Sequence, residues 1–101
     1  MKKILLGLIF VASSLVAGED YFVVTESQHQ TVYKFNVKNN DYVMIKKSPT
    51  RCGSMTLLDH KNKYIKGVPD TLSTINEKLQ SGNYKLQVIA ENSDCNINII
   101  Y

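Results

Sequence analysis

The clearest structural signal in the chain is the sequence LQSGNYKLQV, at residues 79–88. It combines a glycine at position 82, an aromatic side chain at Tyr84 and alternation of apolar and polar side chains from Tyr84 onward. Glycine reaches backbone angles that other residues avoid, and a period of two is typical of a strand with one buried face. The stretch therefore predicts a tight turn that leads into a core β-strand.

The same period of two recurs on both sides of this stretch. Apolar and polar side chains alternate over residues 33–37, 84–90 and 95–101, and less regular strand candidates lie at 21–25, 42–46, 55–58 and 64–66. Segments rich in Asn, Asp, Ser, Gly and Pro separate them, at 38–41, 48–49, 59–63, 81–83 and 92–94. Short strands at this spacing are typical of a sandwich or barrel. We expect an all-β fold, a small antiparallel β-sandwich of about seven to eight strands.

The segment 69–82 is ambiguous. Leu72, Ile75 and Leu79 fall at helical spacing, and a helix could begin after Pro69 and end at Gly82. However, the run TLSTIN at 71–76 consists largely of poor helix formers, and the neighbouring segments are strands. We favour a loop that leads into a short strand.

The first seventeen residues have the pattern of a secretory signal peptide. Lys2 and Lys3 precede an apolar run at 4–12, and small residues at 13–17 follow it. The run is shorter than the ~20 residues that a membrane-spanning helix needs, although an uncleaved anchor is the alternative. We expect cleavage after Ala17, a β-sandwich domain at 18–101, and a bacterial protein that is periplasmic or secreted.

Export favours a disulfide between Cys52 and Cys95, the two cysteines of the chain. The chain-entropy model gives a loop of this length about 4 kcal/mol of stabilisation. A metal site would need further ligands close by, and neither cysteine lies in a CxxC or CxxH motif. We expect no metal and no cofactor.

The formal net charge of +3 does not indicate a nucleic-acid partner. Without Lys2 and Lys3 there are ten cations against nine acids, a net charge of +1. Within 46–66, however, six cations accompany a single acid, Asp59. They form one basic patch if their loops meet at one end of the fold, and are otherwise a solvated set of side chains. These cations are Lys46, Lys47, Arg51, Lys61, Lys63 and Lys66.

No catalytic motif is present, so we expect a protein that is not an enzyme. The two histidines, His29 and His60, lie in polar segments without ligand spacing, and both are expected to be exposed loop residues. Asn39, Asn40 and Asp41 offer oxygen ligands for Ca²⁺, but the twelve-residue loop pattern is absent and a hairpin turn explains them.

The order of strand patterns resembles a known type of sandwich. A Tyr-x-Phe-x-Val strand at 33–37 is followed by a polar turn, a Tyr-Val-Met-Ile strand, a Leu-Leu-Asp strand end and Ser-Gly-x-Tyr-x-Leu-x-Val at 81–88. Over residues 30–101 this order is similar to the bacterial pre-peptidase C-terminal β-sandwich and to the periplasmic inhibitors of g-type lysozyme. The second resemblance implies that Ser81, Gly82 and Tyr84 form an inhibitory, partner-binding loop.

Three functions follow from these observations. The first is an exported binding protein that inhibits a lysozyme-like cell-wall hydrolase. The second is a module that binds envelope glycan or an anionic polymer through the basic segment and tyrosines such as Tyr42 and Tyr64. The third is a small hydrolase, which has the least support because no nucleophile and base are recognisable in the sequence.

Overall fold

The computed structural model describes residues 18–101, so the predicted signal peptide lies outside the described residues. The described chain consists of β-strands and one short 3₁₀ helix, in the order β2 Glu19–Val24, β3 Gln30–Val37, β4 Asp41–Ser48, η2 Thr50–Cys52, β5 Gly53–Asp59, β6 Tyr64–Val68, β7 Thr74–Leu79, β8 Gly82–Ala90 and β9 Cys95–Ile100. Within this part of the chain, no helix has the length and apolar character needed to span a membrane.

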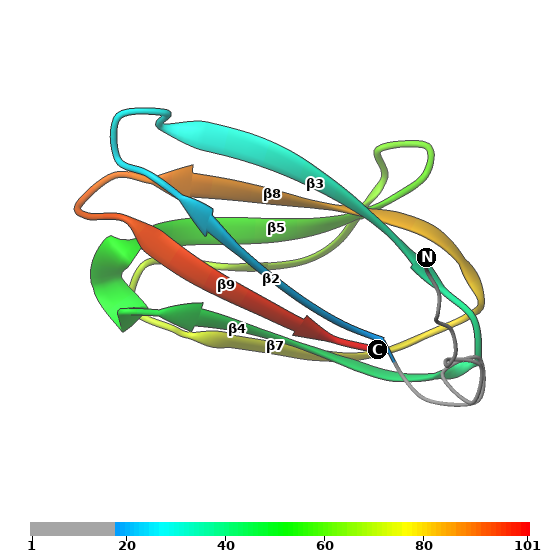
Figure 1. Cartoon of the computed structure of the whole chain (residues 1–101). Helices are drawn as coiled ribbons and strands as arrows, with labels where there is room; N and C mark the ends of the chain where they lie inside the picture. The colour runs from blue at the N-terminus through cyan, green and yellow to red at the C-terminus, as the bar shows by residue number, and fades with distance from the viewer. Residues whose placement is uncertain (1–17) are drawn as a thin grey trace, which may run out of the picture.

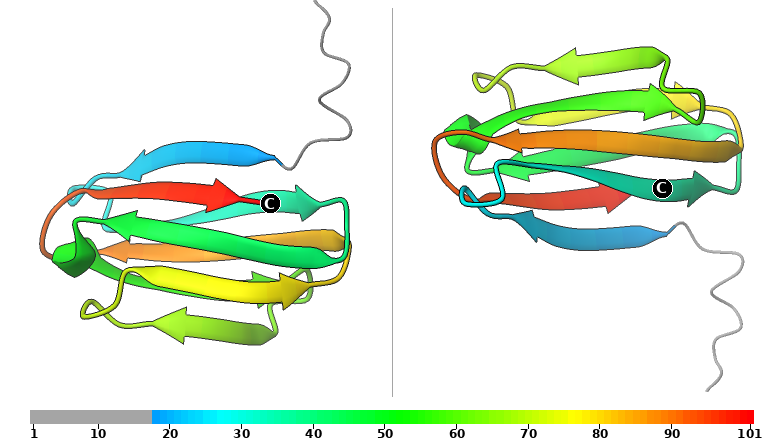
Figure 2. Two further views of the ribbon diagram at one scale, coloured as in Figure 1. Left: turned by 90° about the horizontal axis from the view of Figure 1, so that it is seen from below. Right: turned by 90° about the horizontal axis from the view of Figure 1, so that it is seen from above.

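The strands form two antiparallel sheets of four strands each (Figure 1). One sheet has the order β2-β9-β4-β7, and the other has the order β3-β8-β5-β6. Figure 2 shows the two sheets lying one over the other. The predicted all-β sandwich is therefore confirmed.

The ambiguous segment is a loop followed by strand β7, as the sequence favoured. Strand β7 pairs antiparallel with β4, with Ile45 opposite Ile75 and Asp41 opposite Leu79. Ile75 and Leu79 are both buried, whereas Leu72 is exposed in the preceding loop. Cross-strand pairing and burial of one strand face thus outweigh the helical spacing of these three residues.

The core lies between the sheets and consists of alternate residues from each strand. From Leu86 onward in β8 and throughout β9 every second side chain is buried, while the side chains between them are at least partly exposed. The fully buried side chains come from both sheets and include Val24, Ile45, Leu57, Leu86, Val88, Ile97 and Ile99.

The predicted disulfide is present, and both of its cysteines are fully buried. Cys52 ends η2, where the chain crosses from β4 in one sheet to β5 in the other, and Cys95 begins β9. The carbonyl oxygen of Cys52 also accepts the backbone N–H groups of Glu91 and Asn92, each at 2.9 Å. The bond therefore joins the crossover between the sheets to the loop that precedes β9.

Lys47 corrects one expectation from the sequence, because it belongs to the core and not to a basic surface. Its side chain is only 2 % exposed, and its ammonium group donates a hydrogen bond to the carbonyl oxygen of Thr50. Burial lowers the pKa of Lys47, while the charge of Asp70 opposes this effect. The reason is register, since Lys47 shares the inward face of β4 with Val43 and Ile45.

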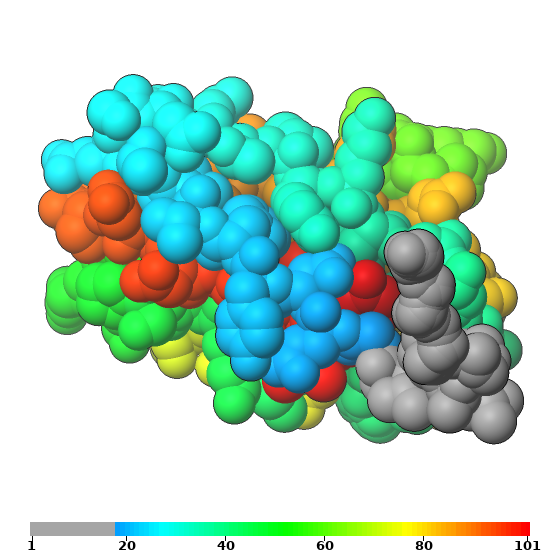
Figure 3. All heavy atoms as spheres, in the orientation of Figure 1, coloured from blue at the N-terminus to red at the C-terminus, as the bar shows by residue number. Residues whose placement is uncertain are grey.

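A cluster of aromatic side chains closes the edge between β2 and β3. The hydroxyl groups of Tyr33 and Tyr101 both donate to Oδ2 of Asp20, each at 2.9 Å. The ring of Tyr33 also stacks on Phe22, with 4.3 Å between the ring centroids. Figure 3 shows β2 at the surface, bordered by the atoms of β3 and β9. The cluster links the two sheets where no hydrogen-bonded ladder does.

Removal of the disulfide should destabilise the fold. Replacing Cys52 and Cys95 together with alanine is expected to lower the free energy of unfolding by about 4 kcal/mol in urea denaturation, because the unfolded chain loses its cross-link. Alanine is preferred to serine because both positions are fully buried. The account would be contradicted if both thiols of the unreduced protein reacted with an alkylating agent, as measured by intact mass.

The tyrosine cluster should make the fold sensitive to alkali. Burial, and then the hydrogen bond to Asp20, raise the pKa of Tyr101 to about 12, above the usual value of ~10. A phenol with a raised pKa stabilises the fold fully below pH ~10 and loses this contribution as the pH rises toward ~12. Ultraviolet titration of tyrosinate should show a late step that Tyr101→Phe removes. Ionisation of all tyrosines near pH 10 would contradict this account.

Candidate functional site: the Ser81 end of the sandwich

Three turns meet at the end of the sandwich opposite the disulfide, and we call this region the Ser81 end. They are the turns at 38–40, 60–63 and 80–81, which connect β3 to β4, β5 to β6 and β7 to β8 (Figure 1). Strand pairing brings them together, since Val37 lies opposite Gly82 and Asp59 lies opposite Tyr84. The sequence-predicted loop residues Ser81, Gly82 and Tyr84 therefore occupy the middle of this end.

Side-chain hydrogen bonds fix the backbone around Ser81. Oδ1 of Asn40 accepts the backbone N–H of Ser81 at 2.8 Å and thereby ties the β3–β4 turn to the β7–β8 turn. The hydroxyl group of Tyr84 donates to the carbonyl oxygen of Gln80 at 2.7 Å. Ser81 itself is exposed, and Tyr84 is half-buried with its ring against Phe35, 6.1 Å between centroids. The result is a fixed turn that presents the serine side chain to solvent.

The β5–β6 turn is fixed in a similar way. Oδ1 of Asp59 accepts the backbone N–H groups of Lys61 and Lys63 at 2.8 and 2.9 Å. The N–H of Lys63 and, to a smaller extent, that of Lys61 hold the pKa of Asp59 below its usual value. Asn62, in the same turn, adopts a left-handed backbone and accepts a hydrogen bond from Nζ of Lys85 at 2.6 Å.

A hollow of about 270 Å³ lies between the turns at 60–63 and 80–81. Ser81, His60 and Asp59 all line it, and these are the residue types of a hydrolase triad. However, no hydrogen bond joins Ser81 to His60 in the described structure, and Oδ1 of Asp59 is engaged by backbone N–H groups. The arrangement lacks the nucleophile–base contact that a serine hydrolase uses.

The structure does not bring the six cations of the basic segment together. Lys46 and Arg51 lie toward the disulfide end, on β4 and η2, and Lys47 there is buried. Lys61 and Lys63 lie in the turn at the opposite end. Strand β5 runs the length of the sandwich between the two groups, which separates them, and Lys66 is on the edge strand β6. The condition for a single patch, loops that meet at one end, is not met.

The remaining candidates of the sequence are placed as follows. His29 and His60 are both exposed, in the turns before β3 and after β5. Tyr42 and Tyr64 are 62 % and 63 % exposed, but they belong to different sheets. Within residues 18–101, no three His, Cys, Asp or Glu side chains lie close enough together to hold a metal ion.

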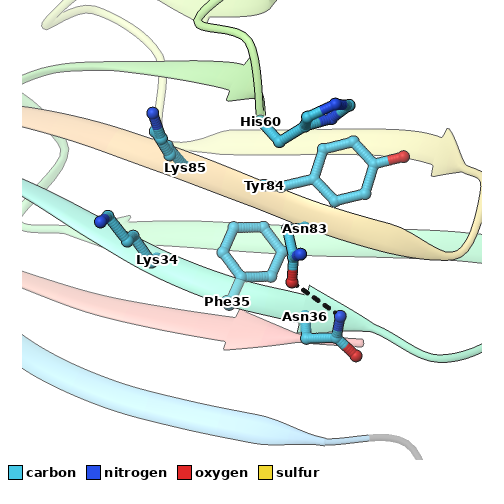
Figure 4. Close-up of a pocket in the computed structure, with 7 residues that line it drawn as sticks. All are labelled: Lys34, Phe35, Asn36, His60, Asn83, Tyr84 and Lys85. Carbon is cyan, nitrogen blue, oxygen red and sulfur yellow. Dashed lines mark hydrogen bonds between the residues drawn. The ribbon is translucent and has the colours of Figure 1, made fainter.

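Sequence reasoning missed a groove on the outer face of the β3-β8-β5-β6 sheet, shown in Figure 4. It has a volume of about 480 Å³ and is lined by Lys34, Lys85, Asn36, Asn83 and His60, with Phe35 and Tyr84 beneath. Lys34 lies directly opposite Lys85 in the β3–β8 ladder, and Asn36 lies opposite Asn83. Period-two alternation places each of these four residues on the outer face, but the pairing becomes visible only once the register is known.

Solved structures that are similar to this chain include the following two. One is the pre-peptidase C-terminal domain of a collagenase from Bacillus anthracis, with a TM-score of 0.60, 19% identity, and coverage of 83% of this chain and 87% of that chain. The other is the Aeromonas hydrophila protein PliG, a periplasmic lysozyme inhibitor of g-type lysozyme, with a TM-score of 0.62, 13% identity, and coverage of 84% and 85%.

The resemblance expected from the strand pattern is therefore confirmed, and at these identities the similarity shows the fold alone. No protein-family model matches the chain, and no curated protein matches it in sequence.

The turn at Gly82 should depend on its glycine. Gly82 has φ of +152°, which side-chain-bearing residues rarely adopt, while a Cβ added at this position would meet open space, with the nearest atom 4.0 Å away. Gly82→Ala should therefore cost roughly 1–3 kcal/mol of stability through backbone strain alone. The neighbouring Ser81→Ala should stay within about 0.5 kcal/mol. Equal melting temperatures for the two variants would contradict this account.

Proposed function

We propose that the protein is an exported binding protein that inhibits a lysozyme-like cell-wall hydrolase with its Ser81 end. The observation that carries this proposal is the fixed turn around Ser81, whose N–H is held by Asn40 while its side chain is exposed. A loop already ordered in the free protein loses little conformational entropy when it enters a partner's cleft. Such a loop suits an inhibitor, which must remain rigid inside an enzyme.

The fold and the predicted export support the same function. One of the two similar structures is a periplasmic inhibitor of g-type lysozyme, and the similarity covers most of its length and most of this chain. We propose that residues 1–17 are a cleaved signal peptide and that 18–101 form the exported domain. The disulfide between Cys52 and Cys95 fits an oxidising compartment such as the periplasm.

A binding role is favoured over a catalytic one. The exposed serine and histidine at the Ser81 end are not hydrogen-bonded to each other within the described structure. Binding of an anionic polymer through the basic segment has less support, because the segment's cations are divided between the two ends. We therefore propose neither a hydrolase nor a polymer-binding module built on that segment.

Ser81→Arg tests the proposal. A long charged side chain at the centre of the Ser81 end should prevent close contact and raise the inhibition constant by about tenfold or more. Folding should be unaffected, because Ser81 is exposed. The measurement is lysis of cell-wall substrate by g-, c- and i-type lysozymes at increasing inhibitor concentration, with thermal melting of each variant alongside.

Ser27→Arg is the matched control, because Ser27 is exposed in the turn between β2 and β3, at the disulfide end. It adds the same charge and should inhibit as well as the unchanged protein. The proposal fails if the unchanged protein inhibits none of the three lysozyme types. Ser81 is removed from the interface if both arginine variants inhibit equally.

A further inference from the structure

We propose that the outer face of the β3-β8-β5-β6 sheet binds an anionic polysaccharide, whose sugars carry carboxylate or phosphate groups, at the groove between Lys34 and Lys85. This site uses none of the six cations of the basic segment, and it does not depend on lysozyme inhibition. The proposal rests on the charge of the groove, on the exposed aromatic ring beside it and on the amide groups along it.

The charge argument begins with the pairing of Lys34 and Lys85. These two residues lie directly opposite each other on neighbouring antiparallel strands, so their side chains leave the same face of the sheet (Figure 4). Like charges in this position destabilise a sheet. A chain that is otherwise locally consistent usually breaks such a rule at a functional site. An anion bound between the two ammonium groups would remove the repulsion.

Nothing in the described groove neutralises these charges. Its lining contains no carboxylate. Nζ of Lys85 donates to Oδ1 of Asn62, which is a neutral acceptor and helps to hold the ammonium group in place. The groove therefore combines two lysine side chains, of which Lys85 is held in place, with open space of about 480 Å³. This combination favours a ligand with negative charge.

The exposed ring beside the groove points to a sugar chain as the carrier of that charge. Tyr64 is 63 % exposed, and Leu58 pairs with Lys85 on one side and with Tyr64 on the other. The row from Lys34 to Tyr64 thus crosses four strands, about 14 Å, which is the length of a short oligosaccharide. Aromatic rings offer the C–H faces of sugars a flat apolar surface.

Gly67 and the paired amides complete the surface. A Cβ at Gly67 would lie 3.3 Å from the Tyr64 ring, so the glycine lets the ring rest against strand β6. At the other side of the groove, Nδ2 of Asn36 donates to Oδ1 of Asn83 at 2.8 Å. This bond orients both amides, whose other polar groups, Oδ1 of Asn36 and Nδ2 of Asn83, are of the type that bonds to ligand hydroxyl groups.

Affinity electrophoresis with four polymers tests the site in the disulfide-bonded protein. The polymers are polygalacturonate, which carries carboxylates, phosphomannan, which carries phosphates, neutral mannan, and polyphosphate, which carries charge without sugar. We expect retardation by one or both acidic polysaccharides and none by mannan. The acidic polysaccharide that retards the protein more strongly shows whether the site prefers carboxylate or phosphate groups. The proposal is overturned if neither acidic polysaccharide retards the protein.

Variants connect the binding to the groove. Lys34→Gln with Lys85→Gln should weaken binding of the acidic polysaccharide about tenfold, and the melting temperature should stay the same or rise as the repulsion disappears. Tyr64→Ala should weaken polysaccharide binding about fivefold without changing any binding of polyphosphate. Both results are expected from a site that binds the anionic group and the sugar of the same ligand.

The matched control is Lys46→Gln with Lys78→Gln, which removes the same charge from exposed positions on the other sheet. It should bind as the unchanged protein does. The proposal is overturned if the control variant weakens binding as much as the Lys34/Lys85 variant does. It is also overturned if polyphosphate binds as strongly as the polysaccharide and Tyr64→Ala has no effect, because charge attraction alone would then explain the binding. If the Lys34/Lys85 variant loses lysozyme inhibition and the protein binds no polysaccharide, the groove belongs to the enzyme interface and this proposal fails while the proposed function stands.

Discussion

The bond between Cys52 and Cys95 joins the two sheets at the point where the chain crosses between them, and the geometry of the sandwich depends on that junction. A domain of this size buries a small core, so a single cross-link is a large part of its stability. The β8–β9 loop is hydrogen-bonded to the same carbonyl oxygen of Cys52. The ammonium group of Lys47 donates to the carbonyl oxygen of Thr50, the first residue of η2. The disulfide and these hydrogen bonds therefore all involve η2.

The disulfide lies at one end of the sandwich, and the turns proposed to bind a partner lie at the other. At the Ser81 end the described chain has no covalent cross-link, and order comes from side-chain oxygens of Asn40 and Asp59 that accept backbone N–H groups. These bonds fix the turns without covering Ser81, which is exposed. The lysine-lined groove shares His60, Asn83 and Tyr84 with the hollow at this end but extends over the outer face of one sheet. The two surfaces differ in chemistry and border each other.

Much of the fold could be predicted from the sequence, because period-two alternation and turn residues report directly on strands and their ends. The same alternation places Lys47 in the core with Val43 and Ile45, whereas the charge of a lysine taken alone predicts a surface position. Apart from the disulfide, which the count of cysteines and the expected export indicated, contacts between distant residues could not be predicted in this way. The approach of Lys34 to Lys85 follows from strand register, which no local pattern contains.

The central claim, that the Ser81 end enters the cleft of a lysozyme, is tested most directly by nuclear magnetic resonance of the isotope-labelled protein. Unlabelled g-type lysozyme would be added and the backbone amide signals followed. The account predicts changes confined to the turns at 38–40, 60–63 and 80–81 and to the first residues of β8. Changes centred on the turns at 25–29 and 91–94, or no change at all, would contradict it.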